Sequence, residues 1–452
     1  MAVVDREGAA SAGDGPALSG LARDSLIYVV GIVLVRAGPF FITPVLTRAL
    51  VQDAFGALDV LMALQGMVIA LTSLNLDMAV ARYFYEHEAD DRVGFVSSIL
   101  WTLVGLGLAA ALIVTAASDA IATRLFDGAD YRAAVTIVGW TVPWMVVSTT
   151  TLSLLRFARQ PVTFVLLSTF GVAVQIVAVM IAVRMFQPSV TSVLTAQAIA
   201  QAALAAAVVI RCRGYFRGRP AWSYLRRAFA FCLPQFPSVI ITWYLASANR
   251  FYLLSLSTLA AVGLFAGASR INSIVVSLAQ AFSNAWLPFA MSIMHTPRAK
   301  ETYARVMYLV VGGLSLLTAI VAVTARPFLY YYAGPAYAPA ATTAAILVLS
   351  TVVSQGLGWF LGLGLLITER PFYASVAQFV AFAVNTALNL WLIPGWGAAG
   401  AALAVLGGSL AQIAAVGFAS NRFYPFRYNR LVWAGPTAAG LFILFARWAG
   451  LA

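Results

Sequence analysis

Apolar runs of 18 or more residues follow one another from residue 25 almost to the C-terminus. A helix of this length spans the hydrocarbon core of a bilayer, which is about 30 Å thick. The alternating ten-residue segments of a membrane β-barrel are absent. The pattern predicts an all-α polytopic membrane protein. Its thirteen predicted spans lie at residues 25–49, 57–81, 95–117, 133–156, 161–183, 190–211, 229–254, 260–290, 304–325, 340–366, 372–393, 397–419 and 431–448.

Three arginines fall inside these runs, namely Arg36, Arg250 and Arg270. A guanidinium at the centre of a bilayer costs roughly 2.5–3.5 kcal/mol on insertion scales, so it needs a polar place to point. Arg36 shares a helix face with Thr43 and Thr47. It is either a structural residue paired with a carboxylate or an anion contact in a cavity. Together the three residues predict a water-filled cavity between helices.

Two stripes of polar residues run along the seventh and eighth spans, at helical spacing. The first holds Gln235, Ser238, Thr242 and Asn249, with Arg250 one step round; the second holds Arg270, Ser273, Ser277, Gln280 and Asn284. Facing stripes of this kind form either a tightly packed polar seam or an aqueous route. Neither span offers a carboxylate to its arginine, so the aqueous route is the favoured interpretation.

The second predicted span carries two acidic residues, Asp59 and Asp77, eighteen positions apart. Helical rise would separate them by about 27 Å, so each is expected near one end and they cannot form a catalytic pair. Capping or pairing with a local arginine is the expected role, and proton coupling by one of them is the alternative. In the eleventh span, Asn385 and Asn389 lie one turn apart and serve either helix packing or cavity lining.

Composition and charge sharpen this picture. The chain of 452 residues is 62% hydrophobic and only 10% charged, with a net charge of +12. Of its 28 Lys and Arg, 19 fall on one predicted side of the membrane and 6 on the other. The positive-inside rule then places the N-terminus in the cytoplasm. The short basic loops suit lipid headgroups, so no nucleic-acid partner is expected.

The predicted spans group into units. Residues 1–24 are expected to be a disordered cytoplasmic tail, followed by an N-lobe of six helices at 25–211, a basic cytoplasmic linker at 212–228 and a C-lobe of six helices at 229–419. Residues 420–452 add a C-terminal helix, which Pro436 could leave incomplete. Phe55-Gly56-Ala57 aligns with Val262-Gly263-Leu264, and this weak repeat favours an internal duplication, as in many transporters.

Several chemistries lack support in the sequence. No G-x-x-x-x-G-K-[ST], H-E-x-x-H or G-x-S-x-G motif occurs, and no extramembrane segment could form a catalytic domain. We expect neither enzymatic activity nor a cofactor. The neighbours Glu86, His87 and Glu88 point apart on a helix, so we expect no metal site there. Cys212 and Cys232 are expected to be structural thiols, without a disulfide.

Four stretches resemble the polysaccharide-biosynthesis flippases of the multidrug/oligosaccharidyl-lipid/polysaccharide (MOP) exporter superfamily. They are TRALVQDAFG at 47–56, LDMAVARYF at 76–84, AFSNAWLPF at 281–289 and NTALNLWLIPGWGAAGAA at 385–402. The sequence departs from this family at Asn249-Arg250, where an Asp-Arg pair is common, and at Asn75, where glycine is usual. The loss of a carboxylate beside Arg250 leaves that arginine freer to meet an anion and argues against proton coupling there.

The resemblance implies two six-helix lobes around a central cavity that opens alternately to each side of a bacterial inner membrane. The implied cargo is a polyprenyl-diphosphate-linked oligosaccharide, such as an O-antigen or lipopolysaccharide repeat unit, and a polysaccharide polymerase and other biosynthesis proteins are the implied partners. The expected substrate-binding residues are Arg36, Arg250, Arg270, Asn249, Thr242, Asn284 and Asn385, with Asp77 or Asp59 for any coupling.

Two other functions stay open at this stage. One is a cation-coupled multidrug antiporter of the same superfamily, which would need a buried acidic cluster in the N-lobe. The other is a membrane-embedded glycan polymerase or ligase. Such an enzyme generally needs a large outer loop with catalytic residues, and the predicted outer loops near 119–132 and 326–339 are short.

Overall fold

The computed structural model describes residues 31, 38–86, 89–126, 131–425 and 429–450. Residues 38–49 are helical. The helices that follow are α2 (Gln52–Ser73), α3 (Leu76–Tyr83), α4 (Ala89–Ala116), α5 (Ser118–Phe126), α6 (Arg132–Phe157), α7 (Pro161–Met185), α8 (Val190–Arg211), η2 (Arg213–Phe216), α9 (Trp222–Cys232), η3 (Leu233–Gln235), α10 (Phe236–Ser247), α11 (Asn249–Leu256), α12 (Leu259–Ser292), α13 (Ala299–Tyr332), η4 (Pro335–Ala340), α14 (Ala341–Thr351), η5 (Val352–Leu357), α15 (Gly358–Leu361), α16 (Leu363–Ile367), α17 (Pro371–Phe423), η6 (Arg430–Trp433) and α18 (Ala434–Trp448).

Eleven helical segments in the described part of the chain are long and apolar enough to cross a membrane. One of them, α17, has 53 residues, and at 1.5 Å per residue it is far too long for a single crossing. Gly397 interrupts it with φ 51° and ψ −127°, just after Pro394. This helix therefore supplies two spans, in agreement with the predicted break between 393 and 397.

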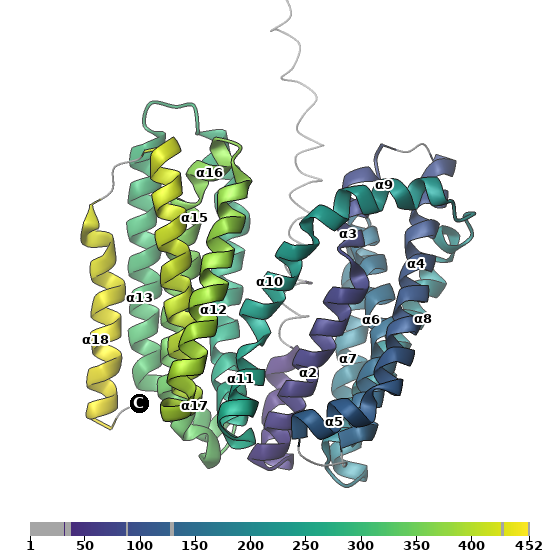
Figure 1. Cartoon of the computed structure of the whole chain (residues 1–452), viewed down its shortest axis with the longest axis horizontal. Helices are drawn as coiled ribbons and strands as arrows, with labels where there is room; N and C mark the ends of the chain where they lie inside the picture. The colour runs from purple at the N-terminus through teal and green to yellow at the C-terminus, as the bar shows by residue number, and fades with distance from the viewer. Residues whose placement is uncertain (1–30, 32–37, 87–88, 127–130, 426–428, 451–452) are drawn as a thin grey trace, which may run out of the picture.

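The helices form two bundles that stand side by side (Figure 1). The first bundle comprises residues 38–49 and α2 to α8, with α6 packed between α4 and α8. The second bundle comprises α11 to α18, with α14 packed against α12, α13 and α17. Helix α18 lies on the outer side of α13 (Figure 1). The predicted architecture of two helical bundles in a polytopic membrane protein is confirmed.

The two bundles contact each other closely where α2 and α12 begin, which we call the closed end. A Cβ atom on Gly56 would lie 2.2 Å from the carbonyl oxygen of Leu259, and one on Gly263 would lie 2.6 Å from that of Gln52. The Phe55 ring packs edge-on against Tyr337, with ring centroids 5.7 Å apart. One continuous core of buried apolar side chains crosses between the bundles at this end.

A diagonal strap formed by α9, η3 and α10 joins the bundles across the front of the view (Figure 1). Helix α9 lies on the first bundle, where Arg227 donates to Glu86 at 2.7 Å and the Cys232 thiol donates to the Asn75 carbonyl at 3.2 Å. Further along, the indole of Trp243 on α10 donates to the Ala63 carbonyl at 3.3 Å. The Tyr244 hydroxyl on α10 also hydrogen-bonds to the Thr386 hydroxyl on α17 at 2.5 Å, so α10 contacts both bundles.

The second predicted span, 57–81, is not one helix. It divides into α2 and α3 at Leu74 and Asn75, both of which have left-handed backbone angles, with φ 46° and 61°. A left-handed residue ends an α-helix, and asparagine tolerates this conformation better than most side chains. This explains how asparagine can replace glycine at position 75. The predicted alignment of Asp59 and Asp77 on one straight helix is therefore wrong.

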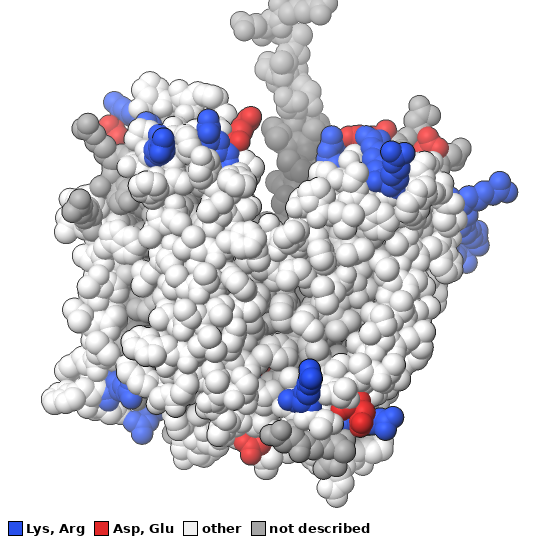
Figure 2. Space-filling model, viewed as in Figure 1, with Lys and Arg blue, Asp and Glu red and all other residues white. Residues whose placement is uncertain are grey.

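Charged side chains gather at the two ends of the bundles, and a broad uncharged band separates them (Figure 2). Such a band, together with the eleven apolar segments, is the arrangement of a multi-pass membrane protein. Both cysteines are buried and unpaired; Cys212 follows α8 and Cys232 ends α9.

Candidate functional site

Asp59 on α2 pairs with two arginines of the second bundle, and we call these three residues the ion-pair cluster. The Arg250 Nε donates to the carboxylate at 2.5 Å, and its Nη1 donates to the Ala246 carbonyl at 3.0 Å. The Arg270 Nη2 lies 3.6 Å from the other carboxylate oxygen. Asp59 is only 5% exposed, so its charge is shielded from bulk water by the two guanidinium groups and the surrounding helices.

Arg270 is less fully paired than Arg250. Its contact with Asp59 is too long for a hydrogen bond, and its Nε is buried without a hydrogen-bond partner in the described residues. Together with Asp59, Thr43 and Gln197 it lines a small cavity of about 80 Å³ between α12 and the first bundle. The ion-pair cluster holds two positive charges against one negative charge, so it retains a net charge of +1.

The prediction that Asp59 lies at a helix end is wrong. Helix α2 begins at Gln52, five residues before the predicted start, so Asp59 lies two turns inside it, about 10 Å from its first residue. Its partners come from the opposite bundle, not from a local arginine. Pairing across helices satisfies the buried carboxylate, since a buried charge without a partner is costly.

A polar cavity of about 540 Å³, which we call the chamber, lies within the second bundle beside Arg250. Four predicted site residues line it: Thr242, Asn249, Arg250 and Asn385. Its other polar lining residues are Ser269, Asn272, Ser273, Ser350, Thr351, Ser354, Gln355, Ser409 and Gln412. From the predicted stripes, Thr242 and Asn249 of the seventh span and Ser273 of the eighth meet at this cavity, with Arg250 beside them. The remaining residues of both stripes do not line it.

Three asparagines form a buried hydrogen-bonded group at one wall of the chamber. The Asn389 amide nitrogen donates to the side-chain oxygens of Asn249, at 2.7 Å, and of Asn385, at 2.9 Å. The group ties α11 to α17 and leaves the amide nitrogens of Asn249 and Asn385 without a partner in the described residues. Helix packing and cavity lining, which the sequence left as alternatives, are combined here.

The other predicted site residues lie elsewhere. Asn284 is exposed on α12, accepts a hydrogen bond from Gln280 at 3.3 Å and does not line the chamber. Asp77 is half-buried in the first turn of α3, beyond the break at Asn75. Arg36 lies outside the described residues, as does His87. Within the described part of the chain, no group of three or more His, Cys, Asp or Glu could hold a metal.

Sequence analysis missed the wall of the chamber formed by η5 and the second half of α17. Ser354, Gln355, Ser409 and Gln412 come from these two segments. A signal was present, because the polar pairs Ser354-Gln355 and Ser409/Gln412 interrupt runs that are otherwise apolar. The spacing alone does not show that the two segments face each other.

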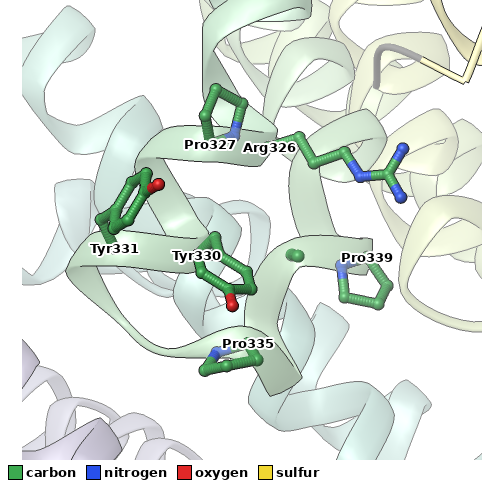
Figure 3. A pocket seen from close by; sticks show the side chains of 7 residues that line it. Arg326, Pro327, Tyr330, Tyr331, Pro335 and Pro339 are labelled. Atoms are coloured by element: carbon green, nitrogen blue, oxygen red, sulfur yellow. The ribbon is translucent and has the colours of Figure 1, made fainter.

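Two further cavities have different linings. One of about 680 Å³ lies where α13 meets η4, between Arg326, Tyr330, Tyr331 and three prolines (Figure 3). Another of about 510 Å³ is lined mainly by apolar and aromatic side chains of α2, α5, α10 and α11, including Trp243 and Phe251. Neither touches the ion-pair cluster, and neither gathers the number of polar side chains found in the chamber.

Comparison with known proteins identifies the family. The model of the family described as "Polysaccharide biosynthesis protein" matches residues 21–294, which is more than half of the chain. The chain belongs to this family. A curated relative, an uncharacterized membrane protein of Haemophilus influenzae, is 37% identical over 65 residues, and the match spans only 16% of that protein's length.

Two solved structures have the same fold over almost the whole chain. The lipid II flippase MurJ in an inward closed conformation has a TM-score of 0.67 at 9% identity, covering 93% of this chain and 98% of that one. An inward-facing multidrug resistance MATE family transporter of the MOP superfamily has a TM-score of 0.67 at 11% identity, covering 92% and 98%. The predicted MOP fold is confirmed.

Proposed function

We propose that this chain moves a polyprenyl-diphosphate-linked oligosaccharide across a bacterial inner membrane by alternating access. The observation that carries the proposal is the ion-pair cluster, in which one carboxylate is shared by two arginines at the boundary between the bundles. A diphosphate needs fixed cations to cross the bilayer. Arginine binds phosphate oxygens through two parallel N–H groups, and charge-assisted bonds of this kind are the strong ones.

The cluster also supplies a step of the transport cycle. An arriving diphosphate competes with Asp59 for Arg250 and Arg270, and it takes over their hydrogen bonds. Asp59 belongs to the first bundle and both arginines to the second, so this exchange weakens a link between the bundles. Gly56, three residues before Asp59, lies in the tight contact of the closed end. Loss of the link therefore favours separation of the bundles at that end.

The membrane and its orientation are part of the same proposal. The excess of Lys and Arg in alternate loops favours a cytoplasmic N-terminus in the bacterial inner membrane. The closed end would then face the periplasm. The proposal includes the lobe boundaries inferred from the sequence, at 25–211 and 229–419. It also includes cooperation with a polysaccharide polymerase that uses the exported repeat unit.

A cation-coupled multidrug antiporter is the second candidate, because Asp59 is a buried acid in the first bundle. The two arginines that flank Asp59 give the cluster a positive net charge, which disfavours a cationic drug. Drug resistance in cells that express the chain, combined with normal surface glycan in a deletion strain, would support this second candidate over the flippase.

The first test locates the lipid-linked intermediate in a deletion strain by leaflet-specific labelling. We expect it to accumulate on the inner face, whereas accumulation of single units on the outer face would indicate a polymerase or ligase. In complemented cells, Arg270→Ala should lower the export rate at least ten-fold, since losing a hydrogen bond to a charged group costs about 1.5–3 kcal/mol. The control Arg184→Ala removes an exposed arginine at the end of α7 and should leave the rate unchanged.

A binding test separates the two roles of the cluster. With purified protein in detergent and inorganic pyrophosphate as the probe, Asp59→Asn should strengthen binding, because the competing carboxylate is gone. Arg270→Ala should weaken it. If Asp59→Asn weakens pyrophosphate binding as much as Arg270→Ala does, the proposed competition between Asp59 and the cargo is wrong.

A further inference from the structure

The chamber is far more polar than anion binding by Arg250 requires. Its wall gathers hydroxyl and amide side chains from α10 of the strap and from four parts of the second bundle: α11, α12, α14 with η5, and both halves of α17. Within a membrane protein, polar side chains that face neither a partner helix nor water are disfavoured, so such a concentration indicates that something polar occupies the space.

Part of this polarity is available to a ligand. Many helical hydroxyls donate to a carbonyl of their own helix, as Thr242 does to Ser238 and Ser350 does to Leu347. Each of these hydroxyl oxygens keeps the capacity to accept a hydrogen bond. Four other lining side chains make no hydrogen bond to any described residue, so all their donors and acceptors are available. They are Ser354, Gln355, Ser409 and Gln412. Each amide offers donors and an acceptor together.

The backbone is irregular at the same wall. Segment η5 is a turn of π-helix, and it carries both Ser354 and Gln355. A π-helical turn replaces the usual i to i−4 bonds with longer ones and is rare; where it occurs, it is frequently part of a functional site. Here it directs two consecutive polar side chains into the chamber.

The charge of the chamber restricts what it can hold. Arg250 is the only charged residue among its described lining residues, and Asp59 lies on the far side of that guanidinium, in the neighbouring cavity. A cation would therefore meet a positive charge and no carboxylate. A neutral or anionic molecule rich in hydroxyl groups meets matching donors and acceptors on all sides.

The cavities beside Arg250 and beside Arg270 also differ in volume. The chamber, at about 540 Å³, falls within the roughly 300–1,000 Å³ range of pockets for small ligands. The cavity on the Arg270 side measures only about 80 Å³. Among the described residues, the space beside the ion-pair cluster for a bulky group attached to a phosphate lies in the second bundle.

We propose that the chamber is a glycan subsite that holds the sugars next to the diphosphate and selects uncharged or acidic sugars over those with a free ammonium group. This inference rests on the proposed function, because it takes the arginines as the diphosphate site. Recognition of hydroxyls by amides discriminates strongly, since a buried amide without its partner is costly. The second bundle thus determines which glycan is carried.

The test measures binding to the purified full-length protein by ligand-induced thermal stabilisation. The probes are a polyprenyl diphosphate and the same lipid bearing one N-acetylhexosamine. The wild-type protein should bind the sugar-bearing probe at least five-fold more tightly. In Gln412→Leu and Ser409→Phe, which remove an amide and fill the chamber, this ratio should fall to about one while binding of the bare lipid stays unchanged.

Controls keep the inference separate from the proposed function. Gln280→Leu, on α12 outside the chamber, should keep the wild-type ratio, and Arg270→Ala should weaken both probes equally. If the chamber variants keep the wild-type ratio although the bare lipid binds normally, the glycan subsite is wrong and the flippase stands. If neither probe binds the wild-type protein, both proposals fail.

A third probe tests the charge argument. The lipid that bears a hexosamine with a free amine should bind the wild-type protein at least five-fold more weakly than the N-acetylated form. Gln412→Leu should not restore its binding, because Arg250 stays in place. Equal binding of the amine and the N-acetylated sugar would overturn the proposed selection.

Discussion

At the scale of single residues, the site depends on pairings between residues far apart in the chain. Asp59 precedes Arg250 by 191 positions, and the two meet only because α2 lies against α11. The sequence predicted Thr242, Asn249, Arg250 and Asn385 as cavity residues, because polar positions on an apolar helix must face something polar. It did not predict their partners, since helical spacing describes one face of one helix and not the face opposite.

Asp59→Asn tests how strongly the ion-pair cluster holds the bundles together. The change leaves two guanidinium groups without a counter-charge, so we expect the free energy of unfolding to fall by about 1–3 kcal/mol. Thermal unfolding of the purified protein measures the loss. The double variant with Arg250→Met should lose less than the two single variants combined, and strictly additive losses would mean that the pair contributes nothing.

Cys212 gives a second prediction at this scale, on the linker side of α8. Burial raises the pKa of its thiol, against the opposing effect of Arg211, so less of the reactive thiolate is present at neutral pH. With Cys232 replaced by serine, maleimide should label Cys212 at least ten-fold more slowly than a cysteine at Gly214. A Cβ at Gly214 meets no atom within 4 Å. If Cys212 and the cysteine at position 214 are labelled at equal rates in the native protein, the protection by burial is wrong. As a control, the two labelling rates should be equal once detergent has unfolded the protein.

At the scale of elements, helix ends were harder to predict than helices. The predicted second span began at 57 and so left Gln52 and Asp53 outside the helix. They instead form the first turn of α2, where an acidic side chain such as Asp53 is favoured by the positive end of the helix dipole. This five-residue difference moved Asp59 from a solvated end into the interior. The break between the eleventh and twelfth spans was predicted correctly, because Pro394 and Gly397 both oppose a continuous helix.

Gly397→Ala tests that break. The backbone there has φ 51° and ψ −127°, a combination that residues other than glycine rarely adopt. We expect a loss of stability of about 1–3 kcal/mol, seen as a lower Tm. Gly395→Ala is the matched control: its Cβ meets nothing within 4 Å and its φ is not positive, so Tm should stay the same or rise slightly. A similar fall in both variants would mean that the bend does not depend on Gly397.

At the scale of the whole molecule, the two bundles touch tightly at the closed end, and Asp59 of the ion-pair cluster lies about one turn of α2 beyond Gly56 in that contact. Composition and hydropathy were enough to predict the class, whereas the two bundles were predicted from the basic linker, the weak internal repeat and the family resemblance. Their relative placement depends on close contacts between small residues. Such contacts leave no periodic signal, because a glycine inside an apolar helix looks the same whether it faces lipid or another helix.

A reversible cross-link tests whether the closed end must open. In a variant without Cys212 and Cys232, Gln52→Cys and Ala260→Cys place two thiols across the contact, where the Gln52 amide nitrogen donates to the Ala260 carbonyl at 3.4 Å. Neither change adds a Cβ to the tightly packed Gly56 or Gly263. Oxidation should stop export and reduction should restore it. Gln52→Cys alone should be insensitive to oxidation. Full export with the disulfide formed would show that the bundles do not separate there.

The contact of Gly56 with Gly263 bears on the origin of the chain. These are the two glycines that the internal sequence repeat aligns, so equivalent positions of the two halves meet each other. A two-fold symmetric homodimer has this property, because each residue near its axis faces its own copy. The arrangement is what fusion of two copies of a smaller ancestral gene would leave. Divergence of the halves then had to keep both positions small, since a side chain on either one would meet the backbone of the other half.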